Sequence, residues 1–316
     1  MKIVLVTPAR PVARSGNRNT ALRWAQLLRE LGHRVRVQMQ WDGKPADAMI
    51  ALHARRSHDS IASYAKAYPV RPLVVMLTGT DLYRDIRVDA VARLSLSLAT
   101  RLVVLQDQGL TELSARLRRK TRVIYQSTRP VKSSPPLASC FEVCISGHLR
   151  EVKDPFRLAA ALQHLPATSR VRAVQIGGAM SAAMKLQAQR WMRREPRYGW
   201  IGELPHGAAL RRLARARLMV ISSRMEGGAN VVTEALSAAV PVIASRIAGN
   251  IGMLGRDYAG YYPSGNERAL ARLLWRAESD AEFYRRLQRQ CAARRHLTRR
   301  QREKRALQLL MRELQI

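Results

Sequence analysis

The sequence predicts an α/β fold made of two domains, each built on a parallel β-sheet. Short apolar runs alternate with amphipathic segments along the whole chain, which is the pattern of repeated strand–helix units. A stretch rich in proline and serine, residues 129–136, interrupts this alternation near the middle. At 316 residues the chain has room for two domains of ordinary size. Open α/β sheets bind ligands at the carboxyl ends of their strands, so we expect a site there.

Each half contains a series of predicted strands separated by helical patterns. In the first half the expected strands are Ile3–Val6, Val35–Met39, Ala48–Leu52, Leu73–Leu77, Leu102–Leu105 and Val123–Tyr125. In the second half they are Phe141–Ser146, Ala173–Ile176, Tyr198–Ile201, Leu218–Ser222 and Val240–Ala244. A helix is predicted over Thr20–Leu31 and stops at Gly32. The C-terminal part reads as two basic helices, about Glu267–Gln290 and Thr298–Leu314.

Composition excludes several classes of protein. No run of eighteen apolar residues exists, so no membrane-spanning helix is expected. The apolar run that starts at Met1 is broken at Pro8, too early for a secretory signal, and reads as a first buried strand. The three cysteines, Cys140, Cys144 and Cys291, form neither a disulfide framework nor a zinc-binding spacing. We therefore expect a cytoplasmic protein.

The chain is strongly basic, with a formal net charge of +32. Eight of its 55 basic residues are lysines, so arginine dominates. Such a field attracts nucleic acid, anionic lipid and phosphorylated small molecules alike. The basic residues are spread along the whole chain, and the aromatic content of 5% leaves few platforms for stacking bases. We expect no specific nucleic-acid partner, only weak contact with anionic surfaces, and a general bias toward arginine is an alternative cause.

The most informative segment is residues 222–236, which places two glutamates on either side of a glycine pair. Glu226 and Glu234 are eight residues apart, with Gly227 and Gly228 between them. The glycines let the backbone turn tightly and approach a ligand. The helix that begins at Asn230 points its N–H groups at whatever lies in front, which suits a diphosphate. This pattern favours a nucleotide-sugar site, and the alternative is a capped surface helix with incidental acids.

This segment resembles the E-x7-E motif of retaining glycosyltransferases with the GT-B fold, in which two Rossmann-like domains face each other across a cleft. The resemblance implies that Glu234 holds the ribose of a UDP-sugar donor and that Glu226 acts close to the sugar. It also implies that the backbone between them cradles the donor diphosphate. The donor-binding backbone positions are Gly228, Ala229, Asn230, Val231 and Val232.

Two further segments of the second half resemble donor-binding segments of the same family. Gly147–Pro155 is similar to the G-R-L-x-x-x-K-G segment, which implies that Lys153 binds the diphosphate. His148 stands where the family has Arg, so either Arg150 compensates or His148 has another task. The segment is expected to open a helix with Asp154 as N-cap and Pro155 at its first position, and the alternative for Lys153 is a surface lysine at a helix start. The turn with Gly202 and Glu203 is similar to the one beside the nucleobase.

The first half contains a basic loop after its first strand. Arg10, Arg14 and Arg18 lie within nine residues, together with Asn17. Guanidinium groups and backbone N–H groups at a strand end can bind an oxyanion. In GT-B enzymes the equivalent glycine loop approaches the donor diphosphate or the acceptor, which gives Gly16 a donor-binding role by resemblance. The alternative is an ordinary strand-to-helix loop.

Two later strand ends of the first half also carry polar residues. His53 follows one strand and is a candidate for acid–base catalysis or for orienting the sugar, although a lone histidine is as often structural. Arg55 and Arg56 add cations beside it. Thr80 and Asp81 form a turn after the next strand, which lies on the acceptor side in many GT-B relatives.

Several whole segments together resemble a narrower family, the selenosugar synthases of bacterial selenoneine biosynthesis. The segments are residues 14–18, 21–25, 51–57, 77–85 and 146–150. The resemblance implies a reaction between a UDP-sugar (UDP-N-acetylglucosamine or UDP-glucose) and selenophosphate that forms a C–Se bond at the anomeric carbon and releases UDP. Selenophosphate is a small, highly charged anion, so arginines at 10, 14, 18, 55 and 56 would suit it.

Two other functions remain open at this point. One is an ordinary retaining UDP-sugar glycosyltransferase that acts on a lipid or glycan acceptor, and the other is a non-enzymatic binder of polyanions. No Asp-x-Asp pair with metal spacing occurs in the loops concerned, so we expect no metal ion and no obligatory cofactor beyond the UDP-sugar substrate.

The expected domain division follows from the linker. Residues 1–132 would form the acceptor domain, 133–139 the linker and 140–290 the donor domain. GT-B enzymes commonly end with a helix that crosses back to the first domain, and the basic helix 291–316 is a candidate for it. The alternatives are an exposed solvated face or an arm on anionic lipid.

Overall fold

The computed structural model of the chain describes residues 1–11, 15–131 and 134–314. Contacts between residues divide the chain into two compact units. The first unit contains Met1–Ser127, Glu226–Ala229 and Arg299–Ile316, and the second contains Thr128–Met225 and Asn230–Thr298. A short piece of the segment 222–236 and the C-terminal helix therefore pack with the first unit.

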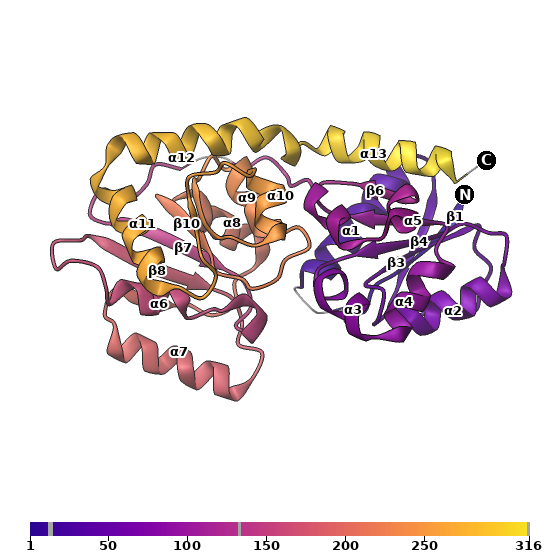
Figure 1. The fold of residues 1–316 in the computed structure, drawn as a ribbon, viewed down its shortest axis with the longest axis horizontal. Helices are drawn as coiled ribbons and strands as arrows, with labels where there is room; N and C mark the ends of the chain where they lie inside the picture. Colours follow the sequence, from indigo (N-terminus) through magenta and orange to yellow (C-terminus); the bar gives the residue numbers. More distant parts are fainter. Residues whose placement is uncertain (12–14, 132–133, 315–316) are drawn as a thin grey trace. The chain divides into compact units, whose positions relative to one another are not determined.

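The first unit is a sheet of six parallel strands with helices on both faces (Figure 1). Its strand order is β2-β1-β3-β4-β5-β6. The strands are β1 (Lys2–Val6), β2 (Arg34–Gln38), β3 (Ala48–Leu52), β4 (Leu73–Leu77), β5 (Arg101–Val104) and β6 (Thr121–Val123). The helices are α1 (Gly16–Glu30), α2 (His58–Ala67), α3 (Ile86–Val88), α4 (Ala90–Leu98), α5 (Ala115–Arg119) and α13 (Arg300–Glu313). A π-helical turn, η1 (Asp81–Asp85), and a 3-10 helix, η2 (Asp107–Glu112), follow β4 and β5.

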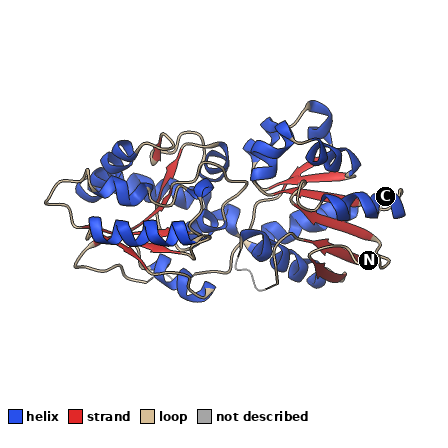
Figure 2. Ribbon diagram, turned by 90° about the horizontal axis from the view of Figure 1, so that it is seen from below, coloured by secondary structure: helices blue, strands red, loops and turns tan. Residues whose placement is uncertain are grey.

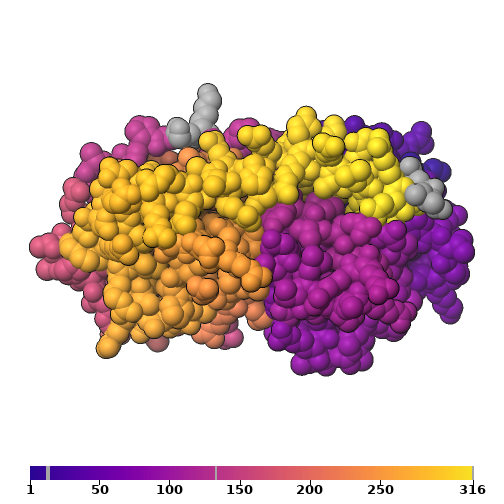
Figure 3. Space-filling view, turned by 45° about the horizontal axis from the view of Figure 1, so that its top comes forward, coloured from indigo at the N-terminus to yellow at the C-terminus, as the bar shows by residue number. Residues whose placement is uncertain are grey.

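The two faces of this sheet bury different helices, because successive strand residues point to opposite sides. Leu5 of β1 joins a core with Trp24 of α1 and Leu307 of α13. Its neighbour Val4 joins the other core, with Tyr64 of α2. Figure 3 shows α13, in yellow, lying directly on the purple surface of this unit. The C-terminal helix is therefore part of the hydrophobic core of the first unit.

The second unit has the same architecture, again with six parallel strands between helices (Figure 2). Its strand order is β12-β11-β10-β7-β8-β9. The strands are β7 (Phe141–Ser146), β8 (Val171–Ile176), β9 (Tyr198–Trp200), β10 (Leu218–Ile221), β11 (Val242–Ser245) and β12 (Tyr261–Tyr262). The α-helices are α6 (Arg157–Leu162), α7 (Ala182–Arg194), α8 (His206–Ala214), α9 (Asn230–Ser237), α10 (Ala248–Leu254), α11 (Glu267–Ser279) and α12 (Ala281–Arg294). The 3-10 helices are η3 (Glu151–Lys153) and η4 (Arg295–Thr298).

The structure confirms the predicted α/β class with parallel sheets and corrects several of the expected elements. β12 is a strand of two residues that the sequence did not reveal. β6 lies two residues earlier than expected. The single helix expected over residues 267–290 is two helices, because Asp280 ends α11 and caps α12 by accepting the Phe283 N–H at 2.9 Å.

None of the helices that the described residues form has the length and apolar character needed to cross a bilayer.

Candidate functional site

Four loops of the second unit meet at one edge of its sheet. β10, β7, β8 and β9 are neighbours and parallel, so the segments after them all leave from the carboxyl edge. These segments carry the residues expected to bind a donor, which are His148, Arg150, Lys153, Gly202, Glu203 and the start of α9. This edge is where open α/β sheets bind ligands.

The loop after β7 is fixed by hydrogen bonds to both neighbouring strand ends. The Leu149 N–H donates to Gly178 O at 2.9 Å, on the β8 side. On the β10 side, the Ser222 hydroxyl donates to Lys153 O at 3.0 Å and the Arg224 N–H donates to Val152 O at 2.9 Å. Lys153 is thereby held beside the segment that leads into the glycine pair. Arg150 is exposed, whereas Lys153 and His148 are half-buried.

Asp154 does not have its expected role as a helix cap. It adopts a left-handed conformation with φ 44°, and α6 begins only at Arg157, with Phe156 in the capping position. The Asp154 carboxylate instead accepts from Arg157 Nε at 2.9 Å. The reason is that the 3-10 helix η3 precedes Asp154, and Asp154 forms the sharp turn between η3 and α6.

The glycine pair after β8, Gly177 and Gly178, lies between the loops after β7 and β9 and brings them close together. A Cβ atom at Gly177 would lie 2.0 Å from Gly147 O, so only glycine fits there. The Gly177 N–H donates to Gly202 O at 2.7 Å. A Cβ at Gly178 would lie 3.4 Å from Glu203 Oε2 and 3.5 Å from His148 Nδ1. His148 and Glu203, which are far apart in sequence, therefore converge over Gly178.

Glu234 lies in the second turn of α9 and pairs with a residue that the sequence did not single out. His206 Nε2, at the start of α8, lies 2.9 Å from Glu234 Oε1. The Glu234 side chain is 14% exposed and that of His206 is 58% exposed. The imidazole donates this bond, because a carboxylate accepts. Glu234 is thus held in a defined orientation at the site edge, with His206 on its solvent side.

The glycine pair of the 222–236 segment packs tightly within the first unit. A Cβ at Gly227 would lie 2.4 Å from Thr78 O, and a Cβ at Gly228 would lie 2.6 Å from Leu105 Cβ. Thr78 follows β4 and Leu105 follows β5, so the pair sits on the carboxyl edge of the first sheet. Both glycines are required because any side chain would collide with backbone or buried atoms.

Glu226, next to this pair, is buried with 8% exposure. Burial raises the pKa of Tyr83 well above its ordinary value, and the negative charge of Glu226 acts in the same direction. The carboxylate of Glu226 therefore lies in the neighbourhood of Tyr83 in the first unit.

Gln126 is a second residue that the sequence analysis missed. It follows β6, is 2% exposed, and its Nε2 donates to Gly228 O at 2.7 Å. A polar residue directly after a predicted strand was the signal that could have found it. Its partner in the glycine pair could not be inferred, because about a hundred residues separate the two.

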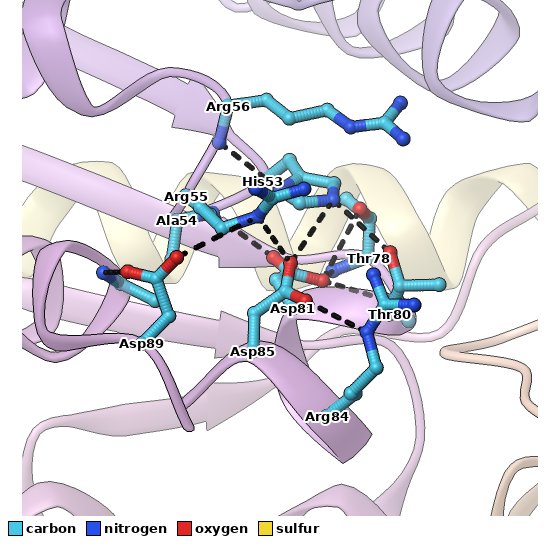
Figure 4. A network of polar contacts seen from close by, with 12 residues as sticks. His53, Ala54, Arg55, Arg56, Thr78, Thr80, Asp81, Arg84, Asp85 and Asp89 are labelled. Carbon is cyan, nitrogen blue, oxygen red and sulfur yellow. Dashed lines mark hydrogen bonds and ion pairs between the residues drawn. The ribbon is translucent and has the colours of Figure 1, made fainter. Parts of the chain in front are cut away.

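His53 is buried in a network of polar contacts after β3 (Figure 4). Its φ is 73°, in the left-handed region that few side chains adopt. Nδ1 accepts the Arg56 N–H at 3.3 Å, so the proton is on Nε2, which donates to Thr80 Oγ1 at 3.1 Å. Burial lowers the pKa of His53, although the nearby carboxylates of Asp81 and Asp85 oppose this. His53 is therefore a neutral residue that joins the loops after β3 and β4.

Asp81 was expected to bind an acceptor, and the structure gives it a different role. It is fully buried, and its carboxylate accepts N–H groups from Ala54 at 3.0 Å, Thr78 at 2.9 Å and Gly79 at 2.8 Å. Charge-assisted bonds of this kind shape the turn on which the glycine pair rests. Asp81 is not accessible to a ligand in this arrangement.

The two arginines after His53 differ in how their charge is used. Arg55 Nε lies 3.0 Å from Asp85 Oδ2 and 3.9 Å from Asp89 Oδ2, so its charge is balanced inside the unit. Arg56 is exposed, and Figure 4 shows its guanidinium turned away from the three aspartates. The five arginines expected to suit selenophosphate are therefore not equivalent.

The segment after β1 forms a helix start where a loop was expected. α1 begins at Gly16, so Gly16, Asn17 and Arg18 form its first turn. Ser15 caps this turn by accepting the Arg18 N–H at 3.4 Å. Arg10 is exposed, and Arg14 lies outside the described residues.

Within the described residues no three His, Cys, Asp or Glu side chains gather as ligands for a metal ion.

Comparison with known proteins agrees with this geometry. Residues 138–294 match the family model described as glycosyl transferases group 1. No curated protein sequence matches the chain.

Solved structures are similar over most or all of the chain. Anabaena Alr3699/HepE in complex with UDP and glucose is 18% identical, with a TM-score of 0.78 over 100% of this chain and 99% of that one. Sucrose-phosphate synthase from Thermosynechococcus elongatus is 17% identical, with a TM-score of 0.77 over 99% and 98%. TarM of S. aureus is 12% identical, with a TM-score of 0.65 over 84% of this chain and 55% of that one. At these identities the likeness shows the fold, and it confirms the predicted GT-B class.

Proposed function

We propose that this chain, whose residues 138–294 match the family model described as glycosyl transferases group 1, is a glycosyltransferase that joins the anomeric carbon of a UDP-sugar to the selenium of selenophosphate. The observation that carries the donor half of the proposal is the convergence of four loops at the carboxyl edge of the second sheet. The observation that carries the nucleophile half of the proposal is the exposed positive charge of Arg10 after β1 and Arg56 after β3 in the first unit.

The donor would be held by residues of several loops at this edge. In this proposal Glu234 binds the ribose hydroxyls, while Lys153, Arg150 and the N–H groups at the start of α9 bind the diphosphate. Lys153 suits this role because Ser222 and Arg224 hold its backbone beside the segment that leads to α9. Glu203 and His148 converge over Gly178 and would contact the nucleotide. One structural relative supports a uridine nucleotide, since HepE was solved with UDP and with UDP-glucose.

The nucleophile would be attracted by Arg10, Arg18 and Arg56. Arg56 is the best of the cations near His53, because Asp85 and Asp89 already balance the charge of Arg55. Asn17 and Thr80 would add neutral donors, and Glu226 would lie close to the sugar. A guanidinium forms paired hydrogen bonds with phosphate-type oxygens, which suits selenophosphate.

The chemistry requires little proton transfer. The selenium atom of selenophosphate is already ionised, so it attacks the anomeric carbon as the C–O bond to the diphosphate breaks. UDP leaves with the bonding electrons, stabilised by the cations and N–H groups around it. A neutral, buried His53 fits a role in orienting the loops better than a role as strong base. Catalysis would rest mainly on holding two anionic substrates in position.

The proposal is tested by measuring UDP release as a function of the selenophosphate concentration. Arg56→Gln removes one exposed guanidinium, and we expect the KM for selenophosphate to rise about tenfold with an unchanged KM for the UDP-sugar. Arg285→Gln, on the exposed side of α12, is the matched control and should change neither value. UDP release that ignores selenophosphate and requires a lipid or glycan acceptor would favour ordinary sugar transfer.

A further inference from the structure

The side-chain amide of Gln126 has one possible orientation. Its oxygen accepts two hydrogen bonds, from the Thr20 hydroxyl and from Arg23 Nη2, both on α1. Because both partners are donors, the amide nitrogen must point the other way, where it donates to Gly228 O at 2.7 Å. The contacts with α1 therefore fix a donor against the backbone of the glycine pair.

Arg23 is held in turn by the C-terminal helix. Glu303 of α13 is 1% exposed, and its carboxylate accepts from Arg23 Nε at 3.1 Å and from Trp24 Nε1 at 2.9 Å. It also accepts the Ser127 N–H at 2.8 Å, next to Gln126 in sequence. A buried carboxylate with this many donors is rigid, because each of its bonds is charge-assisted. Glu303 thus fixes both Arg23 and the backbone beside Gln126.

The hydrogen bond from Gln126 also orients the peptide group that joins Gly228 to Ala229. The C=O of Gly228 and the N–H of Ala229 belong to one planar trans peptide and point in opposite directions. When Gln126 holds the carbonyl, the Ala229 N–H must point away from Gln126. Ala229 directly precedes α9, so this peptide plane sets the first of the N–H groups at the start of that helix.

We propose that Gln126 is a positioning residue of the donor site, which fixes the Gly228–Ala229 peptide so that its N–H faces the donor diphosphate. The C-terminal helix supports this orientation through the buried chain of contacts Glu303–Arg23–Gln126. This inference rests on the proposed function, because it assumes that the N–H groups between Gly228 and Val232 bind a UDP-sugar.

Gln126→Glu tests the inference with a change of a single atom. The carboxylate still accepts from Thr20 and Arg23 but cannot donate to Gly228 O at neutral pH. We expect the Kd of UDP, measured by isothermal titration calorimetry on the full chain, to rise about tenfold. The KM of the UDP-sugar should rise in parallel, while the KM of the nucleophile stays unchanged.

Gln290→Glu is the matched control. Gln290 also donates from Nε2 to a backbone carbonyl, Asp257 O at 2.9 Å, and also accepts an N–H, from Ala259. Its loss of one side-chain donor should lower stability slightly and leave the Kd of UDP within twofold.

A second variant keeps the inference testable if Gln126→Glu does not fold. Arg23→Lys keeps the charge, but an ammonium group cannot bond Glu303 and Gln126 in the fixed fork geometry of arginine. We expect the Kd of UDP to rise in this variant as well. An unchanged Kd in folded Gln126→Glu or Arg23→Lys protein would overturn the inference. Failure of the wild-type chain to bind UDP would instead overturn the proposed function.

Discussion

His206 Nε2 lies 2.9 Å from Glu234 Oε1, so the glutamate of the α9 segment is paired before any ligand arrives. One oxygen of the carboxylate is engaged by a histidine that is itself 58% exposed. The pairing holds Glu234 in place, and its other oxygen is the one that would accept the ribose hydroxyl of the proposed donor. This arrangement makes Glu234 the most direct point at which to test donor binding.

Glu234→Gln keeps an acceptor for His206 but replaces the charged acceptor for a ribose hydroxyl by an amide group. We expect the Kd of UDP to rise about tenfold, because a charge-assisted bond is replaced by a weaker one. Titration calorimetry measures this directly. Glu282→Gln, an exposed carboxylate of α12, is the control, and an equal loss of affinity there would show that the effect is not local.

Gly227→Ala and Gly228→Ala should each lower the free energy of unfolding by about 1–3 kcal/mol through overpacking. The added Cβ would meet Thr78 O in the first variant and Leu105 Cβ in the second. Urea unfolding of the purified variants gives the values. Gly199→Ala is the control, because its Cβ would meet only Ala173 O, at 3.9 Å. Unfolding curves that coincide with wild type for both glycine-pair variants would mean that the loop does not pack as described.

Glu303→Ala should destabilise the protein by about 3–5 kcal/mol, because it leaves Arg23 without its buried carboxylate partner. Glu313→Ala on the same helix removes contacts with Arg101 and Arg122 at the surface, so it should cost about 1 kcal/mol or less. Chemical denaturation measures both. Similar values for the two variants would contradict the buried pairing of Glu303 with Arg23.

The pH dependence of stability should include a contribution from His53. Its pKa is lowered from the ordinary 6.5, mainly by burial, so the unfolded chain takes up a proton at a higher pH than the folded one. Stability is therefore complete above pH 6.5 and falls as the pH drops from there toward the lowered pKa.

His53→Asn tests this contribution, because asparagine tolerates the positive φ of 73° better than most residues. The free energy of unfolding of the variant, followed from about pH 7.5 to about pH 5, should fall less steeply than that of wild type. Parallel curves would mean that His53 does not titrate as the structure indicates. His33, whose pKa is also lowered by burial, remains in both proteins and cancels in the comparison.

The fold was predictable because its strands are apolar runs with helical patterns between them. β1 and β4 are buried on both faces, which makes such runs easy to find. β12 could not be found in this way, because a strand of two residues has no pattern. The break at Asp280 was missed because helical spacing continues through a single capping residue.

The candidate site was predictable only where chemistry is local in sequence. The segment with Glu226 and Glu234 carries its glycines and its helix start within a few residues. The partners His206 and Gln126 come from other strand ends and are brought close by the sheets alone. Arg55 is paired with Asp85, whereas Arg56 is exposed. The sequence alone does not show that Asp85 lies beside Arg55.

Transfer of a sugar to selenophosphate can be observed by incubating the purified chain with UDP-N-acetylglucosamine and freshly made selenophosphate, and by following the products with mass spectrometry. We expect UDP together with a sugar that carries selenium on its anomeric carbon, and a strong decrease of both with Glu234→Gln. Release of UDP at the same rate without selenophosphate, and no selenium-containing sugar, would show that selenophosphate is not the nucleophile.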